Sequence, residues 1–551
     1  MIKLSNLIKS RWPDLIVITL MVIYVVWFSF LSIRQHNAFI TGGFDLGNMD
    51  QSVWTTSRGW FLRMTTVENI ESRLGGHADV ILVLLAPLYW IAPNPRTLLI
   101  LQTVILASGG WAAYRLAQWK LGQATIGVIF ALVYLLAPIV QGANLFQFHP
   151  VAFASAFLLF ALYYMLKGDF WWFAGFAILT AISKEEMPLI IILLGLYHWI
   201  FNGDRRGAWL SFGAFVWFLI ANLLIIPAFT PAGENIHYIR YERVGGSISG
   251  IIQTAMTNPI QIVRVATEPA RIDYLIQLLF PVGYLSLFSP IILLLSAPSI
   301  AVNILSDHEP MIAVDLQHYS APIWPFVIAS AILGIDFIVS QLKRVSRVPR
   351  GFLLAVLVTY LLVFTMFNHF IRGRTPLAPT FSIPQITPHH ELASRFLDQV
   401  PPQVAVSAQN PFVPHLSHRP NIYTFPRVDE DTEWLLLDVG GGERAIFPFD
   451  NWTTYHQSIT PFLNQDTFGL VDAADGYLLL RRGAPQKSVP QAFYTFAHTN
   501  GKPPPEAKVA VNFSETATLI GLKITQQGNQ AMIVESWWQQ GSKPLKEYTV
   551  G

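Results

Sequence analysis

Seven long apolar runs dominate the first two thirds of the chain. Each is close to the roughly 20 residues that an α-helix needs to cross the hydrocarbon core of a bilayer. The runs are residues 15–33, 97–117, 122–141, 151–167, 207–228, 319–339 and 351–370. Four shorter runs, at 170–182, 188–202, 276–289 and 291–305, raise the expected number of spans to about 11. With 52% hydrophobic and only 13% charged residues, the sequence predicts an α-helical polytopic membrane protein.

One further apolar segment, residues 79–92, is short and contains a proline, so we expect an interfacial or re-entrant helix there. If this segment does not span, most short basic clusters fall on one side of the membrane, as the positive-inside rule requires. The clusters are Lys3, Lys9 and Arg11; Arg115 and Lys120; Lys167; Arg205 and Arg206; and Lys343, Arg344, Arg347 and Arg350. The predicted location is the plasma (inner) membrane, with a cytoplasmic N-terminus and an outer C-terminal domain.

Three regions follow from the hydropathy pattern. Residues 1–371 form the predicted transmembrane domain, with long outer loops at 34–96 and 229–275, the second suited to lying near lipid headgroups. Residues 372–485 predict a soluble outer α/β domain, and 507–551 an all-β segment. In the α/β domain we expect a helix at 391–400, strands at 404–408, 421–425 and 433–439, and a hairpin at 469–483.

Ionisable residues of the membrane half gather at the outer ends of the predicted spans. Asp45 and Asp50 lie in FDLGNMDQSVW, soon after the first span. A carboxylate at a membrane boundary is costly unless it is solvated or used. Asp45 is the first candidate for a catalytic carboxylate, but it could equally be the N-cap of a helix in this loop. Asp50 is a candidate for substrate binding.

The other candidates come from three outer segments. His77 and Asp79 follow two glycines in GGHAD, and His149 follows the third span, although a lone interfacial His is more often structural. The next candidates are the turn Lys184-Glu185-Glu186 and the pair His318-Tyr319 before a late span. Lys184 could bind a lipid phosphate while Glu185 orients an acceptor; alternatively, this is a solvated turn with a local ion pair. A divalent metal held by Asp45, His77, His149 or Glu185 is chemically feasible, but no ligand spacing supports it, so no cofactor is firmly implied.

Several of these motifs together resemble a known family. FDLGNMDQSVW, GGHADVILVLLAPLYW, the Lys184-Glu185-Glu186 turn and HYSAPIWPF, with SAQNPFVPHLSHRPNIYTFP and GLVDAADGYLLLRRG, are similar to an uncharacterised prokaryotic membrane-protein family. That family is grouped with the GT-C glycosyltransferases, which include protein mannosyltransferases and lipid A aminoarabinose transferases. The resemblance runs from about residue 14 to 483. The later segments NFSETATLIGLKI and ESWWQQGSKPLKEYTV resemble a β-sandwich module, which we expect to be partial and cut short.

The resemblance implies a GT-C-like fold and a sugar donor carried on polyprenyl phosphate. In GT-C enzymes an acidic residue just after the first span acts as base or orienter, and Asp45 matches that position. Lys184 is the counterpart of a lysine that neighbours the donor phosphate. His149 stands where relatives often carry a second acidic residue, which leaves the acceptor chemistry open.

The expected function is sugar transfer at the outer face of the membrane. Asp45 and Glu185 are the predicted catalytic residues, and the predicted substrate-binding residues are Asp50, His77, Asp79, His149, Lys184, Glu186, His318 and Tyr319. The partners would be a polyprenyl-phosphate-sugar donor, an unidentified acceptor and membrane lipids, while a net charge of +2 does not indicate nucleic acid. Two alternatives stay open. One is a transporter or flippase, although no internal repeat is visible and the polar residues are not at midplane. The other is a non-catalytic receptor or scaffold.

Overall fold

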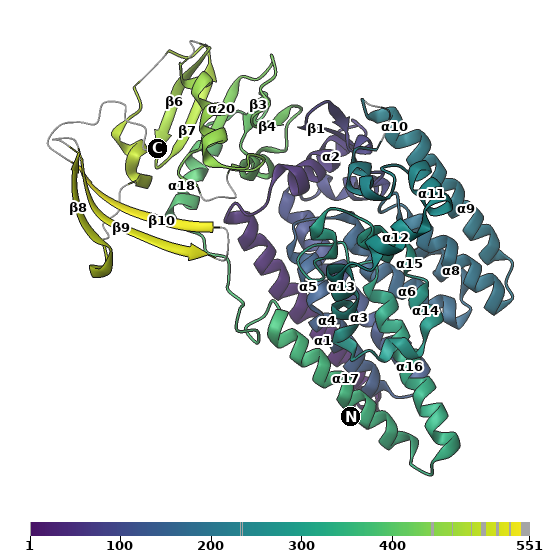
Figure 1. Cartoon of the computed structure of the whole chain (residues 1–551). Helices are drawn as coiled ribbons and strands as arrows, with labels where there is room; N and C mark the ends of the chain where they lie inside the picture. The colour runs from purple at the N-terminus through teal and green to yellow at the C-terminus, as the bar shows by residue number, and fades with distance from the viewer. Residues whose placement is uncertain are drawn as a thin grey trace.

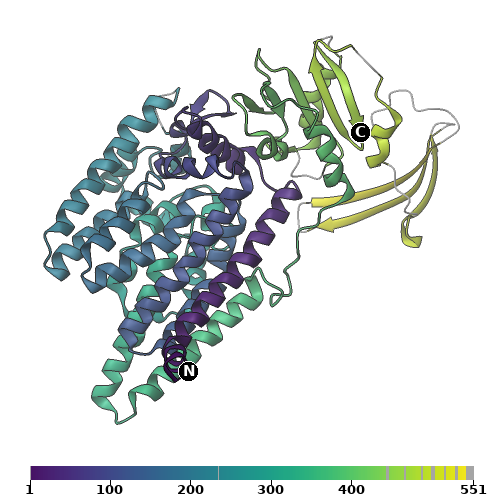
Figure 2. The same cartoon turned by 180° about the vertical axis from the view of Figure 1, so that it is seen from behind.

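A computed structural model describes residues 2–231, 233, 235–441, 446–464, 467–485, 488–497, 503–513, 517–527 and 531–540. The molecule has a helical membrane half and a smaller β-containing half at one end of the helices (Figure 1). The N-terminus and the turn between the last two long helices lie at the opposite end (Figure 2). The protein is therefore a multi-pass membrane protein with its β-containing half beyond one end of the bundle.

The helices of the membrane half follow the apolar runs closely. They are α1 (Ile2–Asn37), α2 (Asn48–Ser57), α3 (Pro95–Leu121), α4 (Ala124–Leu136), α5 (Pro138–Leu145), α6 (Ala154–Lys167), α7 (Phe170–Ala181), α8 (Met187–Asn202), α9 (Arg206–Ile220), α10 (Ile226–Phe229), α11 (Ile248–Thr257), α12 (Pro259–Ala266), α13 (Pro269–Leu279), α14 (Pro290–Leu294), α15 (Ala297–Ile304), α16 (Trp324–Val345) and α17 (Arg350–Arg372). Within the described residues, six helical stretches are long and apolar enough to span, or seven if α4 and α5, bent by 44°, form one span. These seven coincide with the seven long runs, whereas the expected count of about 11 is not confirmed.

Small residues let the long helices pack closely. A Cβ atom on Gly109 of α3 would lie 2.3 Å from the ring of Tyr134 in α4, so only glycine fits there. Gly122, Gly168 and Gly203 end α3, α6 and α8 in the left-handed conformation.

Two of the basic clusters meet around Asp336 at the end far from the β-containing half. Asp336 of α16 pairs with Lys120 at the end of α3 (3.3 Å) and with Arg350 at the start of α17 (3.2 Å). Which face of the membrane this end occupies stays a prediction.

The segment 276–305, expected to cross twice, instead enters the bundle and turns back. Arg271 donates to the carbonyl oxygens of Ile304 and Ser306, so the two ends of the segment lie together. Its turn reaches the middle of α17, where the Tyr360 hydroxyl donates to the Gly283 carbonyl oxygen (3.2 Å). The two short runs are broken by Pro281 and Pro290 into helices too short to span. A segment that returns to its starting side leaves the side of every later helix unchanged.

The two long loops that were predicted to lie outside are folded rather than extended. The first contains α2, the hairpin β1 (Arg63–Val67) and β2 (Ile70–Ser72), and the 3-10 helix η3 (Val80–Trp90). The helix η3, which covers the apolar segment 79–92, packs its Leu82, Leu85 and Tyr89 among the buried residues of α2. The second loop contains the 3-10 helix η6 (Ile236–Val244), α11 and α12.

The soluble α/β domain contains a five-stranded mixed sheet of order β4-β3-β5-β7-β6. Its elements are α18 (Pro388–Leu397), β3 (Val406–Ala408), α19 (Val413–Leu416), β4 (Ile422–Thr424), β5 (Trp434–Asp438), α20 (Trp452–Asn464), β6 (Phe468–Ala474) and β7 (Tyr477–Arg482). Every expected element is present, and α20 is an addition. The turn of the hairpin falls at Asp475 and Gly476, both with positive φ.

The last described strands form a separate sheet. They are β8 (Lys508–Phe513), β9 (Ala517–Gln527) and β10 (Ala531–Gln540), antiparallel and in the order β10-β9-β8. The strand expected at KEYTV lies outside the described residues.

The soluble domain is docked on the first outer loop. The Thr65 hydroxyl of β1 donates to the Ile422 carbonyl oxygen (2.8 Å) and accepts from the Ile422 amide (2.9 Å) at the start of β4. Asp50, at the base of α2, accepts hydrogen bonds from the hydroxyls of Tyr89 and Ser417. The carboxylate of Asp50 is fully buried in this interface, where the hydrogen bonds with Tyr89 and Ser417 occupy it. Its predicted role in binding substrate is therefore not supported by its position.

Candidate functional site

A cavity of about 320 Å³ lies at the end of the helical bundle nearest the soluble domain. Its walls come from the segment after α1, from the stretch between β1 and η3, from η4 (Pro150–Phe153) and the residue before it, from the turn before α8, from η6 and from the segment before α16. Its polar lining consists of Asp45, Asn48, Arg73, His77, Asp79, His149, Lys184, His237, Arg240, His318 and Tyr319. Seven of the ten predicted site residues therefore converge on one cavity from five separate segments.

Asp45 lies within a short π-helical turn, η1 (Gly43–Gly47), that leads directly into α2. Its carboxylate makes no capping hydrogen bond, and α2 begins after Gly47 without a side-chain cap. The alternative role as a helix N-cap is therefore wrong. Turns of this kind occur mostly as local insertions at functional sites.

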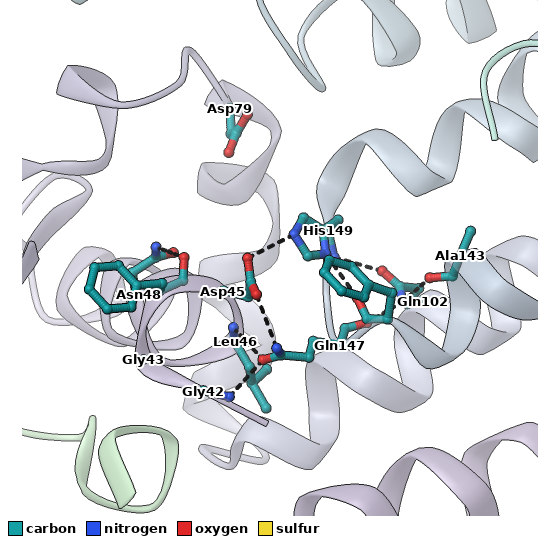
Figure 3. A network of polar contacts seen from close by, with 12 residues as sticks. Gly42, Gly43, Asp45, Leu46, Asn48, Asp79, Gln102, Ala143, Gln147 and His149 are labelled. Atoms are coloured by element: carbon teal, nitrogen blue, oxygen red, sulfur yellow. Dashed lines mark hydrogen bonds and ion pairs between the residues drawn. The ribbon is translucent and has the colours of Figure 1, made fainter. Parts of the chain in front are cut away.

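The carboxylate of Asp45 is held from two sides (Figure 3). His149 Nε2 lies 3.2 Å from Oδ1, and Gln147 Nε2 donates to Oδ2 over 3.0 Å. About a third of the Asp45 side chain remains exposed, at 32%. Each oxygen thus has one partner and keeps a lone pair available to a substrate.

Two glutamines fix this arrangement behind the carboxylate (Figure 3). Gln147 Oε1 accepts from the amides of Gly42 (2.8 Å) and Leu46 (3.3 Å), which clamps the π-helical turn. Gln102 of α3 accepts from the His149 amide (2.8 Å) and donates to the Gln147 carbonyl oxygen (2.6 Å). Because Gln102 is fully buried, it ties both partners of Asp45 to a rigid membrane helix.

The tautomer of His149 follows from its neighbours. Its Nδ1 lies 3.0 Å from the Phe146 carbonyl oxygen, which can only accept, so Nδ1 carries a proton. Its Nε2 faces a carboxylate oxygen, and that contact needs a second proton, on the imidazole or on the carboxyl. The pair of Asp45 and His149 therefore shares one mobile proton.

A second imidazole covers His149. The ring of His318 stacks on it with centroids 3.9 Å apart, and His318 Nδ1 is buried with no hydrogen-bond partner among the described residues. Burial, followed by the charges of His149 and Lys184, lowers the pKa of His318 well below its usual range. His318 is thus a neutral ring at neutral pH, with an unpaired nitrogen beside the cavity.

His77 is held by Glu185 on the far wall. His77 Nδ1 lies 2.8 Å from Glu185 Oε1, and the Ala78 amide donates to Oε2 (3.1 Å). Burial, followed by Lys184 and Arg73, lowers the pKa of His77 well below its usual range, and the ring of His237 stacks on it at 4.2 Å. The carboxylate of Glu185 does not line the cavity. Its geometry therefore suits a residue that positions His77 better than one that touches substrate.

Lys184 is an ammonium group at the edge of the cavity. Its Nζ lies 2.9 Å from Glu186 Oε1 and 5.8 Å from the centre of the Tyr319 ring. Burial lowers the pKa of Lys184, but Glu186 and Glu185 outweigh it and raise that pKa above its usual value. Glu186 lies behind Lys184, outside the lining of the main cavity.

Two arginines complete the lining. Arg73 forks onto Asp79 Oδ2 through Nε (2.7 Å) and Nη2 (2.5 Å), and its Nη1 reaches Asn48 Oδ1 (3.3 Å). Asp79 is buried, so it serves chiefly to hold Arg73. The guanidinium of Arg240 forms no hydrogen bond or ion pair within the described part of the chain. An arginine without a partner beside a cavity is suited to an anionic ligand.

Six residues of the site were not among the candidates from the sequence: Asn48, Arg73, Gln102, Gln147, His237 and Arg240. The outer loop 229–275 was expected only to lie near lipid headgroups, yet its helix η6 supplies His237 and Arg240. Across the described ranges, no group of three or more His, Asp or Glu side chains is arranged to hold a metal ion.

The solved structures similar to this chain include two of ArnT from Cupriavidus metallidurans. One crystal structure, bound to undecaprenyl phosphate, has a TM-score of 0.49 and 11% identity, covering 84% of this chain and 97% of that chain. The other, in the apo state, has a TM-score of 0.47 and 12% identity with the same coverage. Comparison with curated proteins gives no match.

The family comparison covers most of the chain. A family model described as "Predicted membrane protein (DUF2079)" matches residues 35–479, which include every predicted site residue and nearly all of the soluble α/β domain. This confirms the expectation of an uncharacterised membrane-protein family. The chain belongs to the DUF2079 family of membrane proteins.

Proposed function

We propose that this protein is a membrane glycosyltransferase that moves a sugar from a polyprenyl-phosphate-linked donor to an acceptor hydroxyl. One observation carries the proposal. A single cavity, at the end of the bundle nearest the soluble domain, brings the carboxylate of Asp45 together with the cationic side chains of Arg73, Lys184 and Arg240. Such a cavity suits a reaction in which a hydroxyl loses a proton while a phosphate departs.

The reaction balances on these groups. The acceptor oxygen forms a bond to the anomeric carbon, the bond from that carbon to the phosphate oxygen breaks, and polyprenyl phosphate leaves as an anion. The acceptor proton passes to a free lone pair of the Asp45 carboxylate, while the proton already shared with His149 stays on the imidazole. Lys184 and Arg240 face the charge that develops on the phosphate, while Arg73 remains on Asp79.

The position of the cavity supports this function over transport. All of its polar lining lies in loops and helix ends beyond the membrane-spanning stretches. A transporter site is expected at midplane between broken helices. A receptor would not need a carboxylate and an imidazole sharing one proton.

Lipid-linked sugars provide the test. Deletion of the gene should cause one polyprenyl-phosphate sugar to accumulate, and the purified chain should release polyprenyl phosphate from that lipid when an acceptor extract is added. Transport of the intact lipid between vesicle leaflets without release of the sugar would overturn the proposal.

A further inference from the structure

A second cavity, of about 700 Å³, lies between the end of α1 and the soluble domain. Ala38 and Ile40 line it from the membrane side, and residues of α18, β5 and β7 line it from the soluble domain. It shares no lining residue with the first cavity.

The soluble sheet places this cavity where α/β domains commonly bind ligands. The strand β3 lies between β4 and β5 and is parallel to both. After β3 the chain moves to β4 on one side, and after β5 it moves toward β6 and β7 on the other. Pro411 and Phe412 follow β3, and Asp438 and Gly440 end and follow β5; all four line the cavity. The cavity is thus the crevice at the point where the strand order reverses.

An imidazole clamped by two carboxylates marks the polar side of the cavity. His389 Nε2 lies 3.0 Å from Asp438 Oδ2, and its Nδ1 lies 2.7 Å from Asp475 Oδ2. A carboxylate cannot donate, so both ring nitrogens carry protons and His389 is an imidazolium. Its ring stacks on Tyr477 at 4.3 Å. Burial opposes the charge, but Asp438 and Asp475 raise the pKa of His389 above its usual value.

Among the described residues, the rest of the lining combines aromatic, apolar and uncharged polar side chains. The rings of Phe39 and Phe412 meet edge to face at 5.4 Å, and Phe412 meets Tyr477 at 5.9 Å. No Lys or Arg is present among the described lining residues, and the one His⁺ is already neutralised by two carboxylates. An anion would therefore be repelled, whereas a wholly apolar ligand would leave the buried Asp438 beside it without water.

We propose that this second cavity binds a neutral saccharide. A sugar ring presents C–H groups on its faces, which pack on aromatic rings, and hydroxyls around its edge, which hydrogen-bond to carboxylate and imidazole groups. Phe39 would supply the accessible ring, with the buried Phe412 and Tyr477 packed behind it, and Asp438, His390 and Thr387 would supply the polar contacts.

The two cavities are connected through the segment after α1. Ile40 lines the second cavity and Phe44 the first, and four residues of extended chain reach at most about 14 Å. The saccharide would thus be held close to Asp45. Its role as the sugar acceptor, or as the part of the acceptor next to the reacting hydroxyl, rests on the proposed transferase function, whereas saccharide binding itself does not.

The test uses the full chain in lipid nanodiscs free of glycoside detergent. Binding is measured with a panel of fluorescently labelled neutral oligosaccharides and with sulfated forms of the same sugars. We expect a neutral oligosaccharide to bind and its sulfated form to bind at least tenfold more weakly. Asp438→Asn should weaken neutral binding at least tenfold. The matched control is Asp472→Asn on the same sheet, whose carboxylate pairs with Arg395 outside the cavity, and it should not change binding.

A wild-type measurement covers the case in which Asp438→Asn does not fold. The bound oligosaccharide should slow carbethoxylation of His390, which lines the cavity, but not of the exposed His456. No binding by any neutral sugar, equal protection of both histidines, or stronger binding of sulfated sugars would each overturn the saccharide site. Undecaprenyl phosphate binding by the same variant separates the two proposals, because it should be unchanged by Asp438→Asn. Saccharide binding in a chain that neither binds undecaprenyl phosphate nor transfers sugar would overturn the acceptor role and the proposed function together.

Discussion

The two cavities of this protein differ most clearly in what surrounds their histidines. In the first, burial and nearby cations such as Lys184 lower the pKa values of His77 and His318. In the second, Asp438 and Asp475 raise the pKa of His389 despite burial. The same side chain is thus a neutral ring in one cavity and a cation in the other. The neighbours, rather than the residue type, determine which ligand charge each cavity accepts.

The membrane domain and the soluble domain therefore do not have separate functions. Asn410 of the soluble domain accepts hydrogen bonds from the amides of Gly43 (2.7 Å) and Phe44 (3.4 Å), inside the turn that carries Asp45. Val413 packs so closely on Gly43 that a Cβ atom there would lie 2.9 Å away. The soluble domain thus forms part of the wall behind the carboxylate of the membrane domain.

The largest difference between the cavities should appear with Asp45→Asn. This change keeps the shape of the side chain but removes its charge and basicity, so sugar transfer should fall by roughly two or more orders of magnitude. The lipid accumulated by the deletion strain is the donor in this assay, and binding of undecaprenyl phosphate and of neutral saccharide should be retained. Asp307→Asn, which changes an exposed partner of Arg243, is the matched control. Near-normal transfer by Asp45→Asn would remove Asp45 from the chemistry.

Replacement of Lys184 should weaken ligand binding in the first cavity but not in the second, because only the first is expected to bind an anion. Replacement with Ala removes a charge-assisted contact worth about 1.5–3 kcal/mol, so affinity for undecaprenyl phosphate should fall about 10- to 100-fold. Lys184→Arg should keep part of that affinity, saccharide binding should not change, and Lys167→Ala, at the far end of the bundle, is the control. Because Lys184 pairs with Glu186, the double change Lys184→Ala with Glu186→Gln should restore stability but not lipid affinity. Recovery of both stability and lipid affinity in the double variant would show that Lys184 is only a counter-ion for Glu186.

Acid should lower the stability of the protein through His318 of the first cavity, whereas base should lower it through His389 of the second cavity. His318 is protonated in the unfolded chain below about pH 6.5 but not in the folded protein, so stability falls by up to about 1.4 kcal/mol per pH unit on acidification. His389 has the opposite effect on stability. The stability that its protonated ring contributes is fully present below about pH 6.5 and is lost as the pH rises through its raised folded pKa. Thermal unfolding of His318→Gln from pH 6.5 to 5 should show a smaller loss than wild type, whereas the exposed His456→Gln should match wild type. An unchanged slope in His318→Gln would show that this ring titrates normally.

The sequence alone predicted the parts of this protein that depend on local patterns. The long apolar runs became the long helices, and short apolar runs such as 433–439 became strands. The gathering of Asp45, His149 and Lys184 was predicted because helix ends on one side of a membrane must share a plane.

The missed features depend on contacts between residues far apart in the chain. Asp50 was expected at the site, but its side chain turns toward Ser417, 367 residues away. Arg240 was overlooked because nothing in its local sequence shows that η6 folds over the cavity. The pair 276–289 and 291–305 had the hydropathy of spans, and only its short, proline-broken helices explain why it turns back.

The smallest effect should come from the contact that links the cavities, Asn410→Ala. Loss of hydrogen bonds to the amides of Gly43 and Phe44 costs about 1 kcal/mol, so transfer should fall about fivefold through a lower kcat, with lipid affinity nearly unchanged. Asn410→Asp keeps an acceptor for both amides and should recover part of the rate. Hydrogen exchange at Gly43 and Phe44 should accelerate in the Ala variant and return toward wild type in the Asp variant. Normal exchange together with reduced transfer would mean that the soluble domain acts on Asp45 by another route. Wild-type transfer with accelerated exchange would mean that the turn carrying Asp45 needs no support from that domain.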